Sequence, residues 1–124
     1  MNYTYLILVG IGGMIGSIGR YLAGKVVQTR TDSIFPYSTL SVNLLGSFIL
    51  GLILSIATRR NLSPEWGLFL GTGVCGGFTT FSAFSLENLN LLQQKPALSI
   101  LYISISLAGG VLFAALGVWA GRTF

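Results

Sequence analysis

The sequence has 124 residues, of which 52% are hydrophobic and 8% charged, and its formal net charge is +4. This composition, with a mean hydropathy of +0.78, is typical of an integral membrane protein and excludes an ordinary soluble domain. The single cysteine and the lack of histidine exclude an intrachain disulfide, an imidazole base and a histidine-ligated metal, and the sparse basic residues exclude a nucleic-acid-binding surface.

Four apolar segments are long enough to cross a hydrocarbon core, which requires about 20 residues. The sequence therefore predicts an all-α integral membrane protein of one domain, with spans at roughly 3–26, 38–58, 66–93 and 97–120. The first segment has no basic region before it and no cleavage site, so we expect it to be retained as a span. Small residues recur at four-residue spacing, which favours close helix packing: Gly12 and Gly16, Ser47 and Gly51, Gly73 and Gly77, and Gly117 and Gly121.

The first two spans carry polar side chains that a bilayer tolerates only with partners. Arg20 lies inside the first span, where it either reaches the aqueous boundary or forms a positively charged vestibule for an anion. Thr39, Asn43 and Ser47 share one face of the second span. The Asn43 amide has two N–H donors to satisfy, so it either joins two helices or donates to a passing anion.

The third span contains the unusual stretch GVCGGFTTFSAFS at residues 73–85. A straight helix over 66–93 would measure about 42 Å, which exceeds a hydrocarbon core of about 30 Å. Glycine and threonine are poor helix formers, so Gly76-Gly77 beside Thr79-Thr80 predicts a break in mid-membrane. Unwound backbone at this depth must be buried or line a cavity, where its free carbonyls can coordinate a cation. Two breaks facing each other across an antiparallel dimer would suit sodium.

Aromatic and hydroxyl side chains follow the break. Phe81 and Phe84 either pack in the core, as most aromatic stripes do, or present electropositive ring edges to an anion. Glu87 follows one turn later, near the expected mouth of a pathway, where it would pair with a cation or assist entry. In the fourth span Tyr102 and Ser106 add two hydroxyl donors on one stripe.

The basic residues near the ends of the spans are balanced between the two faces of the membrane. Arg59, Arg60 and Arg122 fall on the face that holds both termini, and the other face takes Lys25, Arg30 and Lys95. The positive-inside rule therefore gives almost no preferred orientation. The balance favours insertion in both orientations and an antiparallel dimer of identical chains, although subtler flanking effects would also permit one fixed orientation.

Three stretches, GGMIGSIGRY, STLSVNLLGSFILG and GVCGGFTTFSAFSLE, together resemble the Fluc/CrcB family of small fluoride channels. The resemblance covers all four spans. It implies a dual-topology homodimer in the bacterial plasma (inner) membrane, with two parallel pores that are each lined by both subunits. Such a protein would passively export cytoplasmic fluoride, giving fluoride resistance, and would not be an enzyme.

The resemblance also implies roles for individual residues. The matching motifs assign a pore lining to seven residues: Thr39, Asn43, Phe81, Ser82, Phe84, Tyr102 and Ser106. Arg20 and Glu87 would belong to the vestibule, and the backbone carbonyls of Gly76 and Thr79 from both chains would hold a central, structural sodium ion. Two departures concern the hydroxyl lining, since Ala83 and Gly110 stand where a hydroxyl residue is expected.

Two other functional classes compete with this interpretation. A small dual-topology, proton-coupled exporter of cationic drugs has a similar length and four spans, but it carries an acid in the first span, where this chain has Arg20. A purely structural assembly subunit is disfavoured by the polar stripes. Enzymatic function has little support, because the acids Asp32, Glu65 and Glu87 have no histidine or activated nucleophile beside them.

Overall fold

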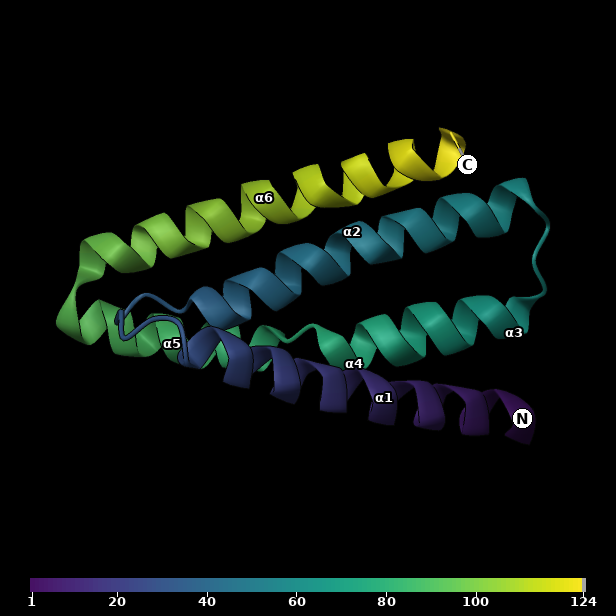
Figure 1. Ribbon diagram of the computed structural model, residues 1–124, viewed down its shortest axis with the longest axis horizontal. Coiled ribbons are helices and arrows are strands. Elements are labelled where there is room, and N and C mark those ends of the chain that lie inside the picture. The colour runs from purple at the N-terminus through teal and green to yellow at the C-terminus, as the bar shows by residue number, and fades with distance from the viewer. Residues whose placement is uncertain (124) are drawn as a thin grey trace.

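The computed structural model describes residues 1–123, and these form a bundle of four long helical segments (Figure 1). Helices α1 (Tyr3–Gln28), α2 (Tyr37–Arg59) and α6 (Pro96–Thr123) are continuous, whereas the third segment, Pro64–Gln94, is composite. Each of the four is long and apolar enough to cross a membrane. The predicted all-α, four-span architecture is thereby confirmed.

The starts of the helices follow from local chemistry. The Asn2 side chain accepts hydrogen bonds from the N–H groups of Thr4 and Tyr5 and so caps α1. All three prolines stand at the start of a later span: Pro36 precedes α2, Pro64 opens the third segment and Pro96 opens α6. Proline is tolerated there because the first N–H groups of a helix have no partner within the helix.

The third segment is divided into shorter elements. It comprises α3 (Pro64–Trp66), the π-helical η1 (Gly67–Cys75), α4 (Gly76–Phe78) and α5 (Phe81–Gln94). Thr79 and Thr80 between α4 and α5 are extended, with ψ angles of 159° and 122°. The predicted break in the third span is therefore confirmed. It falls at the two threonines, while Gly76 and Gly77 remain helical, and the π-helical turn before it was not predicted.

Glycine explains how the helices pair, because α1 packs against η1 and α4, and α2 packs against α6. A side chain at Gly16 or Gly77 would collide with the backbone of the opposite helix, at Val74 and Gly13 respectively. Gly51 and Gly117 allow the same close approach between α2 and α6. The four-residue glycine spacing therefore acts in helix packing, as predicted.

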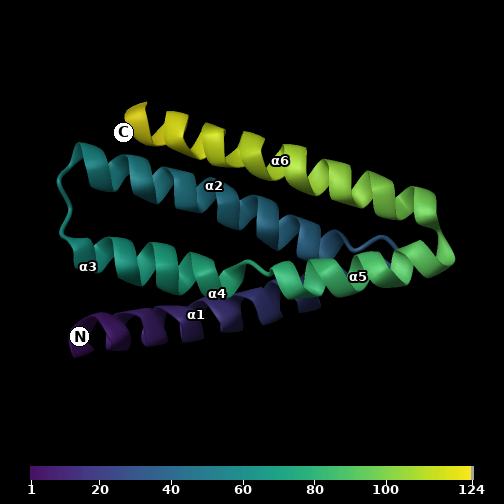
Figure 2. The ribbon, with the colours of Figure 1, turned by 180° about the vertical axis from the view of Figure 1, so that it is seen from behind.

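The two ends of the bundle match the predicted arrangement. The N-terminus, the C-terminal end of α6 and the connection from α2 to α3 lie at one end (Figure 1). The connections from α1 to α2 and from α5 to α6 lie at the other, and the view from behind shows the same arrangement (Figure 2). Three basic residues thus belong to each end.

Candidate functional site

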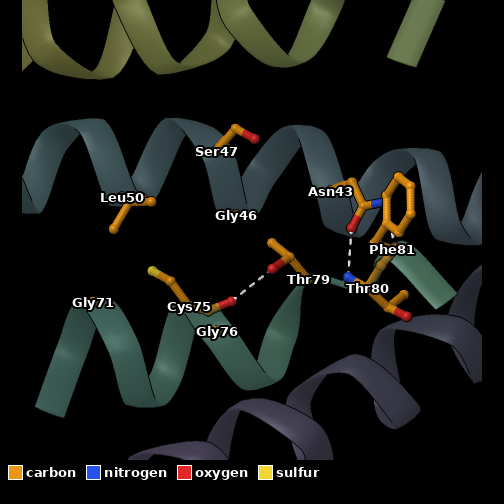
Figure 3. Close-up of a pocket in the computed structure, with 10 residues that line it drawn as sticks. All are labelled: Asn43, Gly46, Ser47, Leu50, Gly71, Cys75, Gly76, Thr79, Thr80 and Phe81. Atoms are coloured by element: carbon orange, nitrogen blue, oxygen red, sulfur yellow. Dashed lines mark hydrogen bonds between the residues drawn. The ribbon is translucent and has the colours of Figure 1, made fainter. Parts of the chain in front are cut away.

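The break in the third segment is held by Asn43 of α2. Its Nδ2 donates to the Thr80 carbonyl at 3.0 Å, and its Oδ1 accepts from the Thr80 N–H at 2.8 Å (Figure 3). One side chain therefore satisfies both backbone groups of an extended residue at membrane depth, where an unpaired group would be costly. The amide has two N–H bonds, so one donor remains beyond this clamp. Joining helices and meeting an anion are thus compatible roles for Asn43.

The break also releases backbone carbonyls. In a continuous helix the N–H groups of Thr80 and Ala83 would bond to the carbonyls of Gly76 and Thr79. Here the Thr80 N–H bonds to Asn43, and the Ala83 N–H bonds to the Thr80 hydroxyl at 3.2 Å. Gly76 and Thr79 both line an open cavity of about 300 Å³ that also includes Ser47 and Phe81 (Figure 3).

Phe81 and Phe84 are neighbours, but they face different surroundings. Their ring centroids lie 5.8 Å apart with planes tilted by 33°. Phe84 is buried and packs on Tyr102, whereas Phe81 is 79% exposed and lies at the edge of the cavity. The structure brings the two predicted rings together and leaves the Phe81 ring exposed on the surface of the chain.

Glu87 connects three helices. Its carboxylate accepts hydrogen bonds from the hydroxyls of Thr39 on α2, at 2.7 Å, and of Tyr102 on α6, at 2.9 Å. Tyr102 is fully buried, and Thr39 is buried beside it. Sequence reasoning placed Glu87 near a pathway mouth and did not predict that two of the expected pore hydroxyls donate to it.

The two remaining predicted hydroxyls differ in position. Ser106 lies one turn after Tyr102 on α6, and its Oγ is buried without a hydrogen-bond partner among the described residues. Ser82 is exposed and lies 3.3 Å from the Thr80 hydroxyl, so it belongs to the start of α5. Gly110 faces Ser47 of α2.

Arg20 meets the broken helix from α1. Its Nε donates to the Gly77 carbonyl at 3.1 Å, which places positive charge at the end of the first half of the third segment, where helix carbonyls lack partners. Arg20 also lines a cavity of about 340 Å³ together with Lys25, Thr39 and Glu87. The two predicted vestibule residues therefore share a cavity, and Arg20 has a backbone partner that the sequence did not indicate.

Residues 7–118 match the family described as "CrcB-like protein, Camphor Resistance (CrcB)". The chain belongs to this CrcB family. It is 48% identical over 122 residues to a protein of Thermus thermophilus, covering 98% of this chain and 96% of that protein. It is 42% identical over 127 residues to a protein of Leptospira interrogans, covering both chains fully, and 45% identical over 117 residues to one of Agrobacterium fabrum, covering 93% and 94%. All three relatives are named "Fluoride-specific ion channel FluC".

The CrcB match spans all four membrane segments. It includes the helix break, the bonds between Asn43 and Thr80, and Glu87 with its hydroxyl partners. The chain is a multi-pass membrane protein whose named relatives are bacterial. Thr80 is the residue of this CrcB site that sequence reasoning missed, since it receives Asn43 and caps α5. Its position in the paired threonines was a signal, because threonine is a common N-cap.

Proposed function

We propose that this chain forms a passive, fluoride-selective channel that exports cytoplasmic fluoride and gives the cell fluoride resistance. The name of the relatives, "Fluoride-specific ion channel FluC", supports fluoride as the transported ion. One observation carries the proposal. The hydroxyl oxygen of Ser106, one helical turn after Tyr102, is buried and has no hydrogen-bond partner among the described residues. A donor left unpaired in a membrane span is costly unless something accepts from it.

Fluoride is small and strongly hydrated, so a pore must replace its water with closely placed donors. The second N–H of Asn43, the Ser106 hydroxyl and the ring edges of Phe81 and Phe84 supply such groups. The Thr80 clamp fixes the Asn43 amide in orientation, so its free donor needs no reorganisation when the ion arrives. In this proposal the narrowness of the passage excludes chloride, while the weakness of each contact permits release.

The assembly that we propose is an antiparallel, dual-topology homodimer with two pores. Phe81 is 79% exposed although it lies at membrane depth beside Asn43 and an open cavity, which suits a ring that completes a pore with a second chain. Both ends of the bundle are equally basic, which suits insertion in either orientation. Each pore would then contain residues of both subunits.

A structural sodium ion at the centre of this dimer fits the residues present. The N–H groups that would bond to the carbonyls of Gly76 and Thr79 in a continuous helix bond elsewhere, and both residues line the same cavity. Backbone oxygen is a suitable ligand for a hard cation. The ion would supply positive charge between two anion pathways. In this proposal it stays in place, and the residues of the chain alone bind and pass fluoride.

Passive transport is sufficient for export, because a negative interior drives an anion outward with about 2.3 kcal/mol per 100 mV. The proposed channel therefore needs no nucleotide and no proton relay, and it performs no enzymatic step. A proton-coupled exporter of organic cations is the competing function, and nothing in the arrangement around Asn43 favours it.

Efflux from liposomes tests the proposal. Purified protein is reconstituted with internal fluoride or chloride, valinomycin is added, and the released anion is followed with an ion-selective electrode. We expect fast fluoride efflux that needs no proton gradient, with no chloride release. Asn43→Ala or Phe81→Ile should abolish or sharply slow the flux while the protein still elutes as a dimer.

Unchanged fluoride flux in both variants would contradict the proposed pore lining. No fluoride flux from verified dimers, together with proton-coupled uptake of an organic cation, would instead support the exporter.

A further inference from the structure

The paired ends of α2 and α6 form a cavity that the proposed channel does not use. The cavity has a volume of about 350 Å³ and is lined by Leu54, Ser55, Thr58, Arg59, Val118 and Arg122. Two arginines and no acidic residue stand among the described residues that line it, whereas Glu87 lines the cavity beside Arg20. This end therefore offers two positive charges next to apolar walls.

The two arginines come from different helices, and the Arg59 side chain is bonded to the backbone of Arg122. Gly117 and Gly121 allow α6 to touch α2 at Phe48 and Ser55, so the helices cross closely just before the cavity. Arg59 also donates from one terminal nitrogen to the Arg122 backbone carbonyl at 3.0 Å. A guanidinium has five N–H donors, so this bond uses only one donor of Arg59, and Arg122 lines the same cavity.

The cavity lies at the level where a membrane meets water. Arg59 and Arg122 belong to the last turns of α2 and α6, which end side by side (Figure 1). Trp119 on α6 and Trp66 at the start of the third segment are both exposed near this end. Exposed tryptophans gather at the headgroup region of bilayers. The apolar part of the cavity then faces acyl chains, and its two arginines face headgroups.

We propose that this cavity, the α2–α6 arginine site, binds the phosphate of an anionic phospholipid. The planar donors of arginine match phosphate oxygens, and basic pockets between membrane helices attract anionic headgroups. Leu54 and Val118 contact the upper part of an acyl chain. A zwitterionic lipid offers the same phosphate, but its own ammonium group weakens the attraction to the two guanidinium groups.

A purely structural role for Arg59 can be separated from lipid binding. Arg59 bonds to the backbone of Arg122, so Arg122→Gln removes a guanidinium group and leaves that carbonyl in place. Arg30→Gln, at the opposite end of the bundle, is the matched control. It removes the same charge and disturbs the charge balance between the two ends to the same extent.

Native mass spectrometry of the purified full-length protein in detergent measures the binding. The protein is titrated with phosphatidylglycerol or with phosphatidylcholine of identical acyl chains. We expect a clear preference for phosphatidylglycerol. Arg122→Gln should weaken phosphatidylglycerol binding roughly fivefold, as about 1 kcal/mol per arginine predicts, and Arg122→Lys should weaken it less. Arg30→Gln should bind as the unsubstituted chain does.

Two further measurements use the unsubstituted protein and therefore do not depend on whether a variant folds. In the unsubstituted protein, added salt should lower the preference for phosphatidylglycerol and leave phosphatidylcholine binding nearly unchanged. Soluble glycerol 3-phosphate should not displace the lipid, because it lacks the acyl chain. No preference in the unsubstituted protein, an equal loss in Arg122→Gln and Arg30→Gln, or full displacement by glycerol 3-phosphate would overturn the α2–α6 arginine site.

Discussion

The side-chain amide of Asn43 combines a structural role with a proposed transport role. It bonds to both backbone groups of Thr80 in the helix break, and it has a second N–H donor that these bonds do not use. The neighbouring hydroxyl groups divide in the same way. The hydroxyls of Thr39 and Tyr102 donate to the Glu87 carboxylate, whereas the Ser106 hydroxyl has no acceptor among the described residues. Fluoride flux and protein stability should therefore respond differently at these positions.

Ser106→Ala should slow fluoride efflux roughly tenfold, as expected for the loss of a hydrogen bond to a charged group, yet leave the melting temperature unchanged. The hydroxyl has no protein partner, so its removal breaks no internal bond. Ser104→Ala is the control, since Ser104 is exposed and bonds to the Ile100 carbonyl of its own helix. A fall in stability without a fall in flux would show that Ser106 is structural.

Tyr102→Phe should lower the free energy of unfolding by about 1–2 kcal/mol, because it removes a hydrogen bond to a carboxylate and keeps the ring that packs on Phe35 and Phe84. Among the described residues Glu87 then retains the bond from Thr39 alone, so we also expect slower efflux. Thermal unfolding and liposome efflux of the same preparation measure the two effects. A variant with full stability and full flux would exclude a role for this hydroxyl.

At this scale the sequence singled out polar side chains in apolar spans, but it did not predict what they contact. Asn43, Tyr102 and Glu87 stood out because polar groups are rare in apolar spans. Their partners depend on how α2, α5 and α6 are rotated about their axes, which spacing within one helix does not determine. The bond from Arg20 to the Gly77 carbonyl was missed for the same reason.

At the scale of elements, the third segment shows where propensity reasoning succeeds and where it fails. Poor helix formers predicted a break, and the break is present. Gly77 beside it remains helical with α1 packed directly against it, so tertiary contact outweighs its low propensity, whereas Gly76 is exposed and helical without such a contact. The π-helical turn of η1 was missed, because an added backbone residue leaves no clear periodic signal in nine residues.

Gly77→Ala should destabilise the protein by roughly 1–3 kcal/mol, because the added methyl group would meet the Gly13 backbone and force α1 away from α4. Gly10→Ala is the control, since a methyl group at Gly10 meets nothing within 4 Å. Thermal unfolding of both variants in the same detergent provides the comparison. Equal melting temperatures would show that the close contact between α1 and α4 contributes little.

At the scale of the whole molecule, the balance of three basic residues against three leaves orientation open. Two lysines added at either end should bias it. We expect Gln93→Lys/Gln94→Lys and Leu62→Lys/Ser63→Lys each to reduce fluoride resistance, because each would supply only one orientation. Growth on fluoride of a channel-deficient bacterium should recover when both variants are expressed together. Full resistance from either variant alone would contradict an antiparallel pair.

Hydropathy predicted the four spans and their approximate limits. Counting charges predicted that the two ends of the bundle carry equal numbers of basic residues. The pairing of spans was not predicted, since α1 and α2 are adjacent in the chain and yet contact each other little. Glycine spacing indicated that close packing would occur, but each of the four spans carries such a pattern, so the partners could not be chosen from the sequence.

This pairing also constrains how the protein is made. α1 has its main partner in the third span, and α2 has its main partner in the fourth. During synthesis the first two spans therefore enter the bilayer before either partner exists, with their glycine faces turned to lipid. The first pair can close only after the third span has been translated, and the second pair closes last, around a chain that is already partly assembled. We therefore expect the native helix packing to form only near the end of translation. The break in the third span, which Asn43 of α2 holds, should reach its final conformation once α2 has packed against α6.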